Sequence, residues 1–408
     1  MANTLQTINM VTQEMLMMLK NNCCFSRAVS REWEKKFAVS GAKIGAELRV
    51  RTTPKFGVQS GPAFVAQNYV EEYVSLAINQ QKHVDVEFTS FENTLQFDNW
   101  AKRVAKPSSA RLANEIDKDG LALYSSIANS VVSPTAAASK FYQYQMANAI
   151  LLQSGAPMDG DFYITVEPME NAAVVNANRG LFQPSEEIAS QYKDGMMRSF
   201  ANFSWQVDQN VASHTTGAWT GQATAIVTVG AQTGSVVLTS GWTNSSPVFL
   251  RGDVIQFTGV FAANPQTLLS TGRLRDFVVT ADVTSSGAGL ASVPVYPPLI
   301  VPPDPRATIV SSPAASAPLL FTGTASTTYQ QNIACHKEAF TLAMVPLIEP
   351  KSGVFARASD PELAMAIRVW QDSNIQTDTH PSRSDILYGW LAQHPALACR
   401  IWSVPGVS

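Results

Sequence analysis

The pattern of hydrophobic and polar positions predicts one amphipathic helix at the N-terminus and short alternating strands soon after it. Apolar residues recur every three and four positions through residues 4–20, as on one face of a helix. Residues 44–51 alternate strictly, with Glu47, Arg49 and Arg51 on the side opposite the apolar residues. This second pattern predicts a half-exposed strand.

A return strand at Tyr69–Leu76 follows a loop rich in glycine and proline, so residues 44–81 are predicted to form a long two-stranded excursion. An isolated hairpin is marginally stable in water, and we therefore expect this one to lie on another subunit. Its candidate assembly residues are its charges, Glu47, Arg49, Arg51 and Lys55.

The remaining periodic segments outside the middle of the chain predict a mixed α and β host. Helices are expected over 108–130, 135–153 and 184–193. Strands are expected at 84–88, Phe162–Val166, Ala339–Val345, Ala364–Val369 and Ala398–Trp402. Residues Asp385–Gln393 are expected to start a short helix or turn.

The middle of the chain contains neither lysine nor glutamate between Asp194 and His336. Because helices are rich in these residues and strands are poor in them, the gap predicts an all-β module inserted into the host. Four strands are predicted inside it, at Ala225–Val229, Ser235–Thr239, Val254–Thr258 and Phe277–Val283. Their regular spacing favours a small barrel or sandwich.

Two consequences follow from an insertion. The host is divided, so residues 1–210 and 331–408 should pack together, and the two ends of the module should lie close to each other. Six prolines between Pro294 and Pro305 exclude helix there and predict a stiff extended edge or connector. The fold class expected is α+β with an inserted all-β barrel.

Composition narrows the function classes. Charged residues make up 15% of the chain, against roughly 25% in an average soluble protein, which favours a chain built into large contacts. A net charge of −3 gives no field that would favour nucleic acid or an anionic membrane. Four cysteines without metal or disulfide spacing fit a reducing compartment. Neither a signal peptide nor a membrane-spanning stretch is expected.

No specific catalytic constellation is recognisable, and we expect no catalytic residue, cofactor or metal. The pair Cys335-His336 suggests a nucleophile and base, but a packed host strand explains it better. His214 is expected in a hinge turn into the module, and Arg251-Gly252-Asp253 in a turn between strands.

Two further groups are candidates for assembly contacts. Met15 and Met18 lie on the apolar stripe of the N-terminal helix, where a partner surface and the subunit's own core give the same pattern. Arg273, Arg275 and Asp276 form the dense charge cluster of the module.

Several segments, in the correct order along most of the chain, carry a family resemblance. Before the module they include Lys43-Ile44-Gly45, Lys82-His83-Val84-Asp85, Lys106-Pro107 and Gly195-Met196-Met197. Within it they include Gly252-Asp253-Val254, Gly259-Val260, Asn264-Pro265 and Phe277-Val278-Val279. After it come Gln331-Asn332, His336-Lys337-Glu338-Ala339-Phe340, Asp385-Ile386-Leu387-Tyr388-Gly389-Trp390 and Arg400. This set resembles the coat proteins of tailed double-stranded-DNA phages of the P22 type.

The resemblance implies the Hong Kong 97 capsid fold, with domain limits that follow the predicted elements. These are an N-terminal arm (1–43), an extended loop (44–81), a peripheral domain with a spine helix (82–134), a first part of an axial domain (135–213), an inserted β-barrel (214–330) and the completion of the axial and peripheral domains (331–408).

The function implied is a major capsid protein that assembles as hexamers and pentamers into an icosahedral shell. Implied partners are further copies of the chain, a scaffolding protein, a portal protein at one vertex and packaged double-stranded DNA held without sequence specificity, with no membrane. The location implied is the virion capsid, assembled in the host bacterial cytoplasm. One departure is that residues Gly217–Thr224 are short and uncharged, where family members can carry a long charged loop that reaches a neighbouring capsomer.

The alternative is a β-rich phage tail or receptor-binding protein with glycan-hydrolase activity. That function needs converging carboxylates in the module. Between His214 and Tyr329 the acidic residues are only Asp253, Asp276, Asp282 and Asp304, which disfavours it.

Overall fold

A computed structural model describes residues 2–31, 47–52, 73–89, 104–133, 137–178, 199–360 and 365–404, together with residues 56, 61, 62, 64 and 66. The chain divides into two compact units. The first unit comprises Met1–Arg51, Tyr73–Gly120 and Phe340–Gln393. The second comprises Thr52–Glu72, Leu121–Ala339 and His394–Ser408. Each unit is therefore built from stretches that lie far apart in the sequence.

The first unit is organised around an antiparallel sheet whose central strand is unusually long. Its strands are β20 (Phe340–Met344), β23 (Thr379–Ala392), β22 (Met365–Gln371), β21 (Val354–Asp360) and β3 (Gln80–Thr89). The order is β20-β23-β22-β21, and β3 also pairs with β23. Strands β3, β20 and β22 were predicted, whereas β21 was not.

The expected helix or turn at Asp385–Gln393 is wrong, because these residues complete β23. Their apolar residues have helical spacing, but the segment is hydrogen-bonded on both sides. Asp385 to Tyr388 pair with β3, and Tyr388 to Ala392 pair with β20. Tertiary pairing therefore overrides the local pattern.

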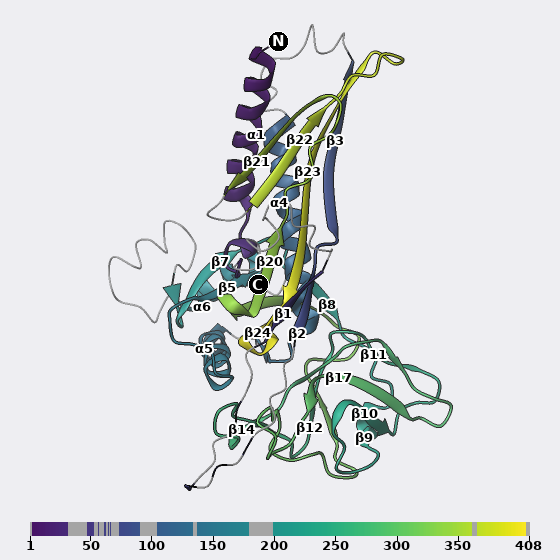
Figure 1. The fold of residues 1–408 in the computed structure, drawn as a ribbon. Coiled ribbons are helices and arrows are strands. Elements are labelled where there is room, and N and C mark those ends of the chain that lie inside the picture. Colours follow the sequence, from purple (N-terminus) through teal and green to yellow (C-terminus); the bar gives the residue numbers. More distant parts are fainter. Residues whose placement is uncertain are drawn as a thin grey trace. The chain divides into compact units, whose positions relative to one another are not determined.

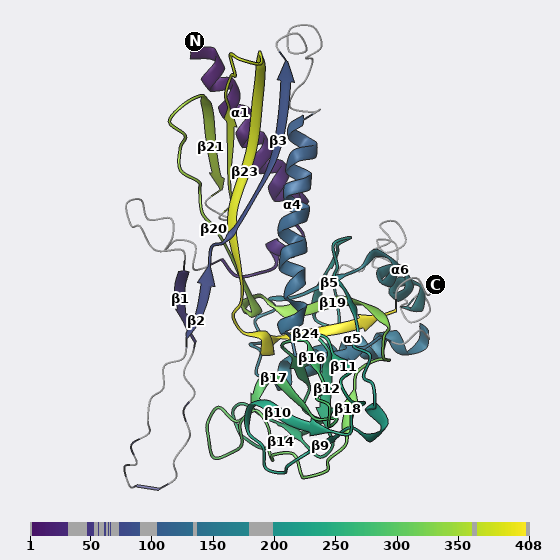
Figure 2. The same cartoon turned by 90° about the vertical axis from the view of Figure 1, so that its right-hand side faces the viewer.

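Two helices pack in the first unit. Helix α1 (Ala2–Asn22) confirms the predicted amphipathic helix and lies against β21 and β22 (Figure 1). Helix α4 (Lys106–Leu121) runs beside β3 and β23 (Figure 2). The Tyr388 hydroxyl on β23 donates to Asp119 of α4 at 2.6 Å, and Lys82 of β3 lies 3.3 Å from the same carboxylate.

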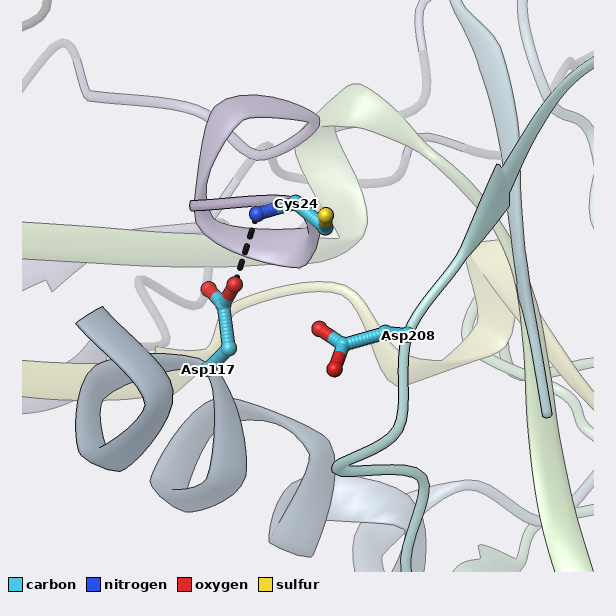
Figure 3. A group of neighbouring side chains, drawn as sticks. All are labelled: Cys24, Asp117 and Asp208. Atoms are coloured by element: carbon cyan, nitrogen blue, oxygen red, sulfur yellow. Dashed lines mark hydrogen bonds between the residues drawn. The ribbon is translucent and has the colours of Figure 1, made fainter. Parts of the chain in front are cut away.

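A buried carboxylate joins the turn after α1 to α4. Asp117 is 1% exposed and accepts the backbone N–H groups of Cys24 at 2.6 Å and Ser26 at 2.9 Å, at the start of the short 3-10 helix η1 (Phe25–Arg27) (Figure 3). Asp208, also drawn in Figure 3, belongs to the second unit, where it accepts the N–H of Asn210 at 2.8 Å.

The predicted two-stranded excursion has a stem formed by β1 (Glu47–Arg51) and β2 (Tyr73–Ala77). Val50 and Leu76 on its apolar side are fully buried against Ala343 and Leu391 of the sheet. The apolar side of the stem therefore packs on its own unit. That the hairpin also lies on another subunit stays a prediction. Lys55 lies outside the described residues.

The second unit contains a seven-stranded sheet drawn from both sides of the inserted module, as predicted. The order is β4 (Ser130–Val132), β24 (Ala398–Ser403), β19 (Thr328–His336), β5 (Phe162–Val166), β7 (Phe203–Val207) and β6 (Ser199–Phe200), with β8 (Ser213–Thr215) also paired to β19. Helices α5 (Ala137–Gln153) and α6 (Pro168–Asn178) pack on each other, and α5 contacts β24. Helix α6 was not predicted.

The predicted helix over 108–130 is shorter than expected. Helix α4 ends at Leu121, the 3-10 helix η3 covers Ala122–Ser126, and β4 then pairs in parallel with β24. The short 3-10 helices η5 (Lys337–Ala339) and η6 (Pro395–Leu397) flank β19 and β24. The helix predicted at 184–193 lies outside the described residues.

The inserted module is all-β, as the composition gap predicted, and it forms a six-stranded barrel, one of the two architectures that the strand spacing favoured. The strand order is β18 (Leu319–Phe321), β12 (Val254–Phe257), β15 (Phe277–Val279), β17 (Ala291–Leu299), β10 (Gly234–Ser240) and β9 (Ile226–Val227). Figure 1 labels β9, β10, β12 and β17 among them. Backbone bonds from Val227 N–H to Ala317 and from Leu319 N–H to Ala225 join the last strand to the first. The barrel therefore closes and leaves no free edge between these strands.

Short strands complete the module. These are β11 (Pro247–Phe249) with β16 (Val283–Thr284) and β13 (Phe261–Ala263) with β14 (Ser270–Leu274), besides the 3-10 helix η4 (Gln222–Thr224). The expectation that the proline-rich segment forms an edge or connector is wrong for Pro294, Pro297 and Pro298, which lie in β17 between β15 and β10. A register shift in the pairing of β10 with β17 accommodates this strand.

Among the described residues, no helix has the length and hydropathy needed to cross a membrane.

Gly389 should tolerate no side chain. A Cβ atom there would lie 2.0 Å from the carbonyl oxygen of Ala77, where β2 passes over β23. Gly389→Ala should lower the free energy of unfolding by about 1–3 kcal/mol, as overpacked cores do. Thermal and urea unfolding would measure this loss. Gly287→Ala is the control, because its nearest neighbour would be Ser245 Oγ at 3.9 Å. Equal stability of the two variants would contradict the close approach.

Candidate functional site

The junction where the barrel leaves and rejoins the host sheet is formed by two paired strands. Strand β8 leads into the barrel and β19 leads out of it, and they pair antiparallel, with Tyr329 opposite His214. Just beyond them, Thr216 N–H donates to Thr327 and Ser326 N–H donates to Gly217. The two ends of the module are thus hydrogen-bonded to each other, which confirms that they lie together.

A fully buried arginine of the host sheet reaches into this junction. Arg400 on β24 is 0% exposed, and its Nη2 donates to the carbonyl oxygen of Gly252 in the barrel at 2.9 Å. The guanidinium carbon lies 5.1 Å from the centre of the Trp402 ring and 5.7 Å from that of Tyr124. Burial lowers the pKa of Arg400 to about 10, although the nearby Tyr124, Asp253 and Asp276 act to raise it. At neutral pH the side chain is still charged, and the two aromatic faces stabilise that charge.

The Arg251-Gly252-Asp253 segment forms the expected turn, and the structure adds a role for it. Gly252 has φ +101°, a conformation that L side chains rarely adopt. Its carbonyl oxygen is the one that Arg400 binds. The tripeptide therefore forms the turn between β11 and β12, and through this turn it packs against the host sheet of its own chain.

Asp253 is the acceptor for several donors around it. It is 0% exposed and accepts the N–H groups of Gly217 and Leu250 and the indole N–H of Trp219, at 3.0–3.2 Å. His214 Nε2 lies 2.9 Å from it. These donors satisfy both carboxylate oxygens of Asp253, and they fix the start of the barrel chain against the turn.

His214 joins this carboxylate to the host. With its proton on Nε2 facing Asp253, the ring accepts the Tyr124 hydroxyl at Nδ1, over 3.3 Å. Its ring also meets Trp402 edge to face, with centroids 5.7 Å apart. His214 was expected in a hinge turn, and the structure places it within strand β8, at 4% exposure.

The ion pair of Arg273 and Asp276 also binds the barrel to β4 of the host. Asp276 accepts the backbone N–H of Ser130 at 3.0 Å, and Arg273 donates to the carbonyl oxygen of the same residue at 3.4 Å. Arg273 also pairs with Asp276. The charge cluster expected to face another subunit is thus largely engaged within its own unit.

Arg275, the third member of that cluster, is half-buried, and burial lowers the pKa of its guanidinium. Glu47, Arg49 and Arg51 do lie on the outward side of β1, where all three are exposed. The guanidinium of Arg49 lies 4.7 Å from the centre of the Tyr73 ring, so its position on the hairpin is fixed.

Met15 and Met18 do not lie equally open to a partner. Met15 is 0% exposed, with Sδ 4.0 Å from the Ser384 hydroxyl, so it belongs to the core of its own unit. Met18 is half-buried. The outward face of α1 instead presents Met10 and Met17, which are 71% and 64% exposed.

The pair Cys335-His336 is a packed strand segment. Successive side chains of a strand point to opposite faces, and His336 bonds to Asp159 at 3.0 Å. Burial raises the pKa of the Cys335 thiol to about 12, which keeps it protonated and poorly nucleophilic at neutral pH.

Sequence reasoning missed Arg400 as the centre of the junction. The available signal was a charged residue inside the apolar strand Ala398–Trp402, since a buried charge requires partners. Its partners lie about 150 and 280 residues away in the chain, at Gly252 and Tyr124, and no local pattern connects them.

The comparison with protein families decides what kind of protein contains this junction. Residues 1–400 match the family model described as P22 coat protein, gene protein 5. The chain belongs to the P22 coat protein family. It is therefore a major capsid protein of a phage, with the Hong Kong 97 type of fold and an inserted barrel. A search of curated proteins finds no significant match.

Solved structures similar to this coat protein are distant. A chain described as Mycobacterium phage Che8 is 12% identical, with 93% of this chain and 90% of that chain covered and a TM-score of 0.47. The capsid of cyanophage P-SCSP1u is 10% identical, with coverage of 94% and 88% and a TM-score of 0.48. A virus-like particle from Pyrococcus furiosus is 7% identical, with coverage of 97% and 99% and a TM-score of 0.42. The assignment of the coat protein rests on the family match.

Asp253→Asn should weaken the junction of this coat protein. The amide replaces one acceptor oxygen by a donor that faces the N–H groups already there. Leaving buried donors unsatisfied costs roughly 1–3 kcal/mol in the free energy of unfolding. Urea unfolding followed by tryptophan fluorescence would report the loss, because Trp219 and Trp402 lie at the junction.

Asp282→Asn is the matched control. Asp282 is an exposed acidic residue of the same barrel, and its hydrogen bond from Arg251 N–H at 2.7 Å can be kept by an amide oxygen. It should unfold like the unchanged protein. If both variants lost the same stability, the special role of Asp253 would be refuted.

Proposed function

We propose that this capsid protein assembles as hexamers and pentamers into an icosahedral shell around the double-stranded DNA of a tailed phage. Membership of the P22 coat protein family over residues 1–400 is the observation that carries the proposal. Scaffolding and portal proteins are the partners proposed for assembly in the host cytoplasm. The packaged DNA is proposed to lie against the shell without sequence-specific contacts, in keeping with the net charge of −3.

In this proposal the predicted domains have distinct roles. The first unit provides the arm, the stem of the extended loop and the peripheral domain, while the second provides the axial domain and the inserted barrel. The limits proposed for the module, residues 214–330, include the paired strands β8 and β19 at its ends.

The outward sides of helices α5 and α6 in the second unit support the proposal that copies of the chain contact one another. Helices α5 and α6 contain one lysine and one glutamate between them, and these two pair with each other inside, where Lys140 Nζ lies 2.7 Å from Glu170 Oε2. The outward sides of both helices are left without charge, and they expose Tyr142 and Met169. Depletion of Lys and Glu with enrichment of aromatic residues and Met is typical of protein interfaces.

The alternative, a tail or receptor-binding protein with glycan-hydrolase activity, is not favoured. Asp253 and Asp276 are buried in the junction. Asp304 is paired with Arg306 at 3.0 Å, and Asp282 holds the backbone of Arg251. Glycan hydrolysis needs two carboxyl groups that face one substrate, and these four are each engaged by their own neighbours.

Expression of the full chain with its phage's scaffolding protein would test the proposal. Sedimentation and electron microscopy should show closed shells, or hexamers and pentamers. A soluble trimer that cleaves glycans would instead support the alternative and overturn the proposal.

The outward charges of the hairpin stem provide a sharper test. Arg49→Glu with Arg51→Glu should leave the fold intact, because both side chains are exposed. Exposed ion pairs contribute ~0–1 kcal/mol each, but a shell repeats every contact. We expect particle yield to fall roughly tenfold, the effect of about 1.4 kcal/mol on an association constant.

The control is Lys106→Glu with Lys351→Glu. Both lysines are exposed, and this double variant changes the net charge by the same amount. It should assemble normally. A normal particle yield from the arginine variant, or an equal loss from both, would remove the hairpin from the assembly contacts.

A further inference from the structure

The outward face of the hairpin stem combines two arginines with a tyrosine. Strands β1 and β2 lie side by side (Figure 2), and their register places Arg49 opposite Ser75 and Arg51 opposite Tyr73. Since side chains alternate along a strand, these four share one face, and all four are exposed. Tyrosine and arginine are among the residue types that most often dominate the energy of a protein contact.

Arg49 lies over an aromatic ring and has no carboxylate partner in the part of the chain that the structure describes. Its guanidinium carbon is 4.7 Å from the centre of the Tyr73 ring. Arg306, Arg368 and Arg383, by contrast, each have a carboxylate oxygen of their own chain at 2.5–3.0 Å. The charge of Arg49 is therefore available to a group outside the subunit.

The ring fixes how the guanidinium of Arg49 is presented. A guanidinium has five N–H donors in a rigid planar fork, and it packs readily against aromatic faces. When it is held over a ring, its N–H groups that point away from the ring remain free to donate. A carboxylate can bind two of these groups at once, which is the geometry of strong arginine–carboxylate pairs.

Order before binding strengthens such a pair. An exposed arginine loses rotamer freedom when a partner immobilises it, and this loss weakens exposed ion pairs. Arg49 has already lost part of that freedom against Tyr73. The ring therefore lowers the entropy cost of a contact that Arg49 makes, without itself binding the partner.

The chemistry of the face favours a carboxylate of a protein. Nucleic acid is bound by clusters of cations, whereas this face holds two arginines and, at Glu47, a carboxylate of its own. Every further copy of the coat protein supplies exposed carboxylates, such as those of Glu87 and Glu349. In a shell, a second copy is the partner that is always present.

We propose that Tyr73 is a positioning residue for assembly, whose ring holds Arg49 in place to bind a carboxylate of a neighbouring copy. This inference rests on the proposed function. It deepens that function because it gives an uncharged residue part of the contact that the hairpin charges make.

Two substitutions separate the aromatic face from the hydroxyl group. Tyr73→Leu removes the face and keeps an apolar side chain, whereas Tyr73→Phe keeps the face. The lowest concentration of the full chain that forms particles with scaffolding protein, in the absence of DNA, is the assembly threshold. Tyr73→Leu should raise it roughly two- to fivefold, the effect of an exposed cation–π contact.

Tyr73→Phe is the matched control and should assemble like the unchanged chain. An unchanged threshold for Tyr73→Leu, or an equal rise for Tyr73→Phe, would overturn the inference.

A double-mutant cycle distinguishes positioning from a structural role. If the ring acts through Arg49, Tyr73→Leu should cause no further rise in the threshold when it is added to Arg49→Gln. A ring that only stabilises the hairpin would raise the threshold equally in both backgrounds, and that result would contradict the proposal. Arg49→Gln alone should raise the threshold at least as far as Tyr73→Leu, so a normal threshold for it would also refute the proposal.

Finished particles test whether the partner is a neighbouring copy. After removal of the scaffolding protein, particles of Tyr73→Leu should dissociate at a lower urea concentration than particles of Tyr73→Phe, because a contact between copies persists in the shell. Equal dissociation would show that the carboxylate belongs to another protein, which overturns the choice of partner.

The order that the ring imposes can be measured without a shell. In the soluble full chain, NMR relaxation of the Arg49 Nε–H group should give a lower order parameter in Tyr73→Leu than in Tyr73→Phe. If the unchanged chain forms no particles, the proposed function fails, and this measurement still decides the positioning. A lower order parameter in Tyr73→Leu would then support it, and equal values would refute it.

Discussion

The second unit depends on one constraint, which is that a charged guanidinium has been taken out of water at the junction of the barrel and the host sheet. A buried charge is costly unless nearby groups satisfy it. Arg400 meets that cost through the carbonyl oxygen of Gly252 and the faces of Tyr124 and Trp402. These groups come from the barrel, from the segment after α4 and from the last strand. Separation of the barrel from the sheet would therefore remove the carbonyl oxygen of Gly252 from this buried charge.

The same principle explains how an inserted domain stays fixed with so few charges. Asp253 gathers donors from the start of the barrel and from His214 of the host strand β8. Asp276 and Arg273 together bind both backbone polar groups of Ser130. The charges of Arg273 and Asp276, which the sequence suggested for contacts with other subunits, thus bind groups within the chain.

The sequence predicted composition-driven features well and long-range pairing poorly. The gap without Lys and Glu located the β module, because strand and turn composition is a local property. It could not show that β17 is an internal barrel strand, since the neighbours of a proline-rich strand are set by tertiary structure. Helical spacing of Ile386, Leu387 and Trp390 gave the wrong element for the same reason. In the candidate site, the outward charges of β1 were predictable from alternation, whereas Arg400 depended on partners far away in the chain.

Hydrogen exchange on Arg400→Met, compared with the unchanged chain, tests most directly whether this arginine joins barrel and sheet. The account predicts that protection falls together in the barrel turn around Gly252 and Val254 and in host strand β19, because both lose the same buried partner. Loss of protection confined to β24, with the barrel amides as protected as before, would contradict it.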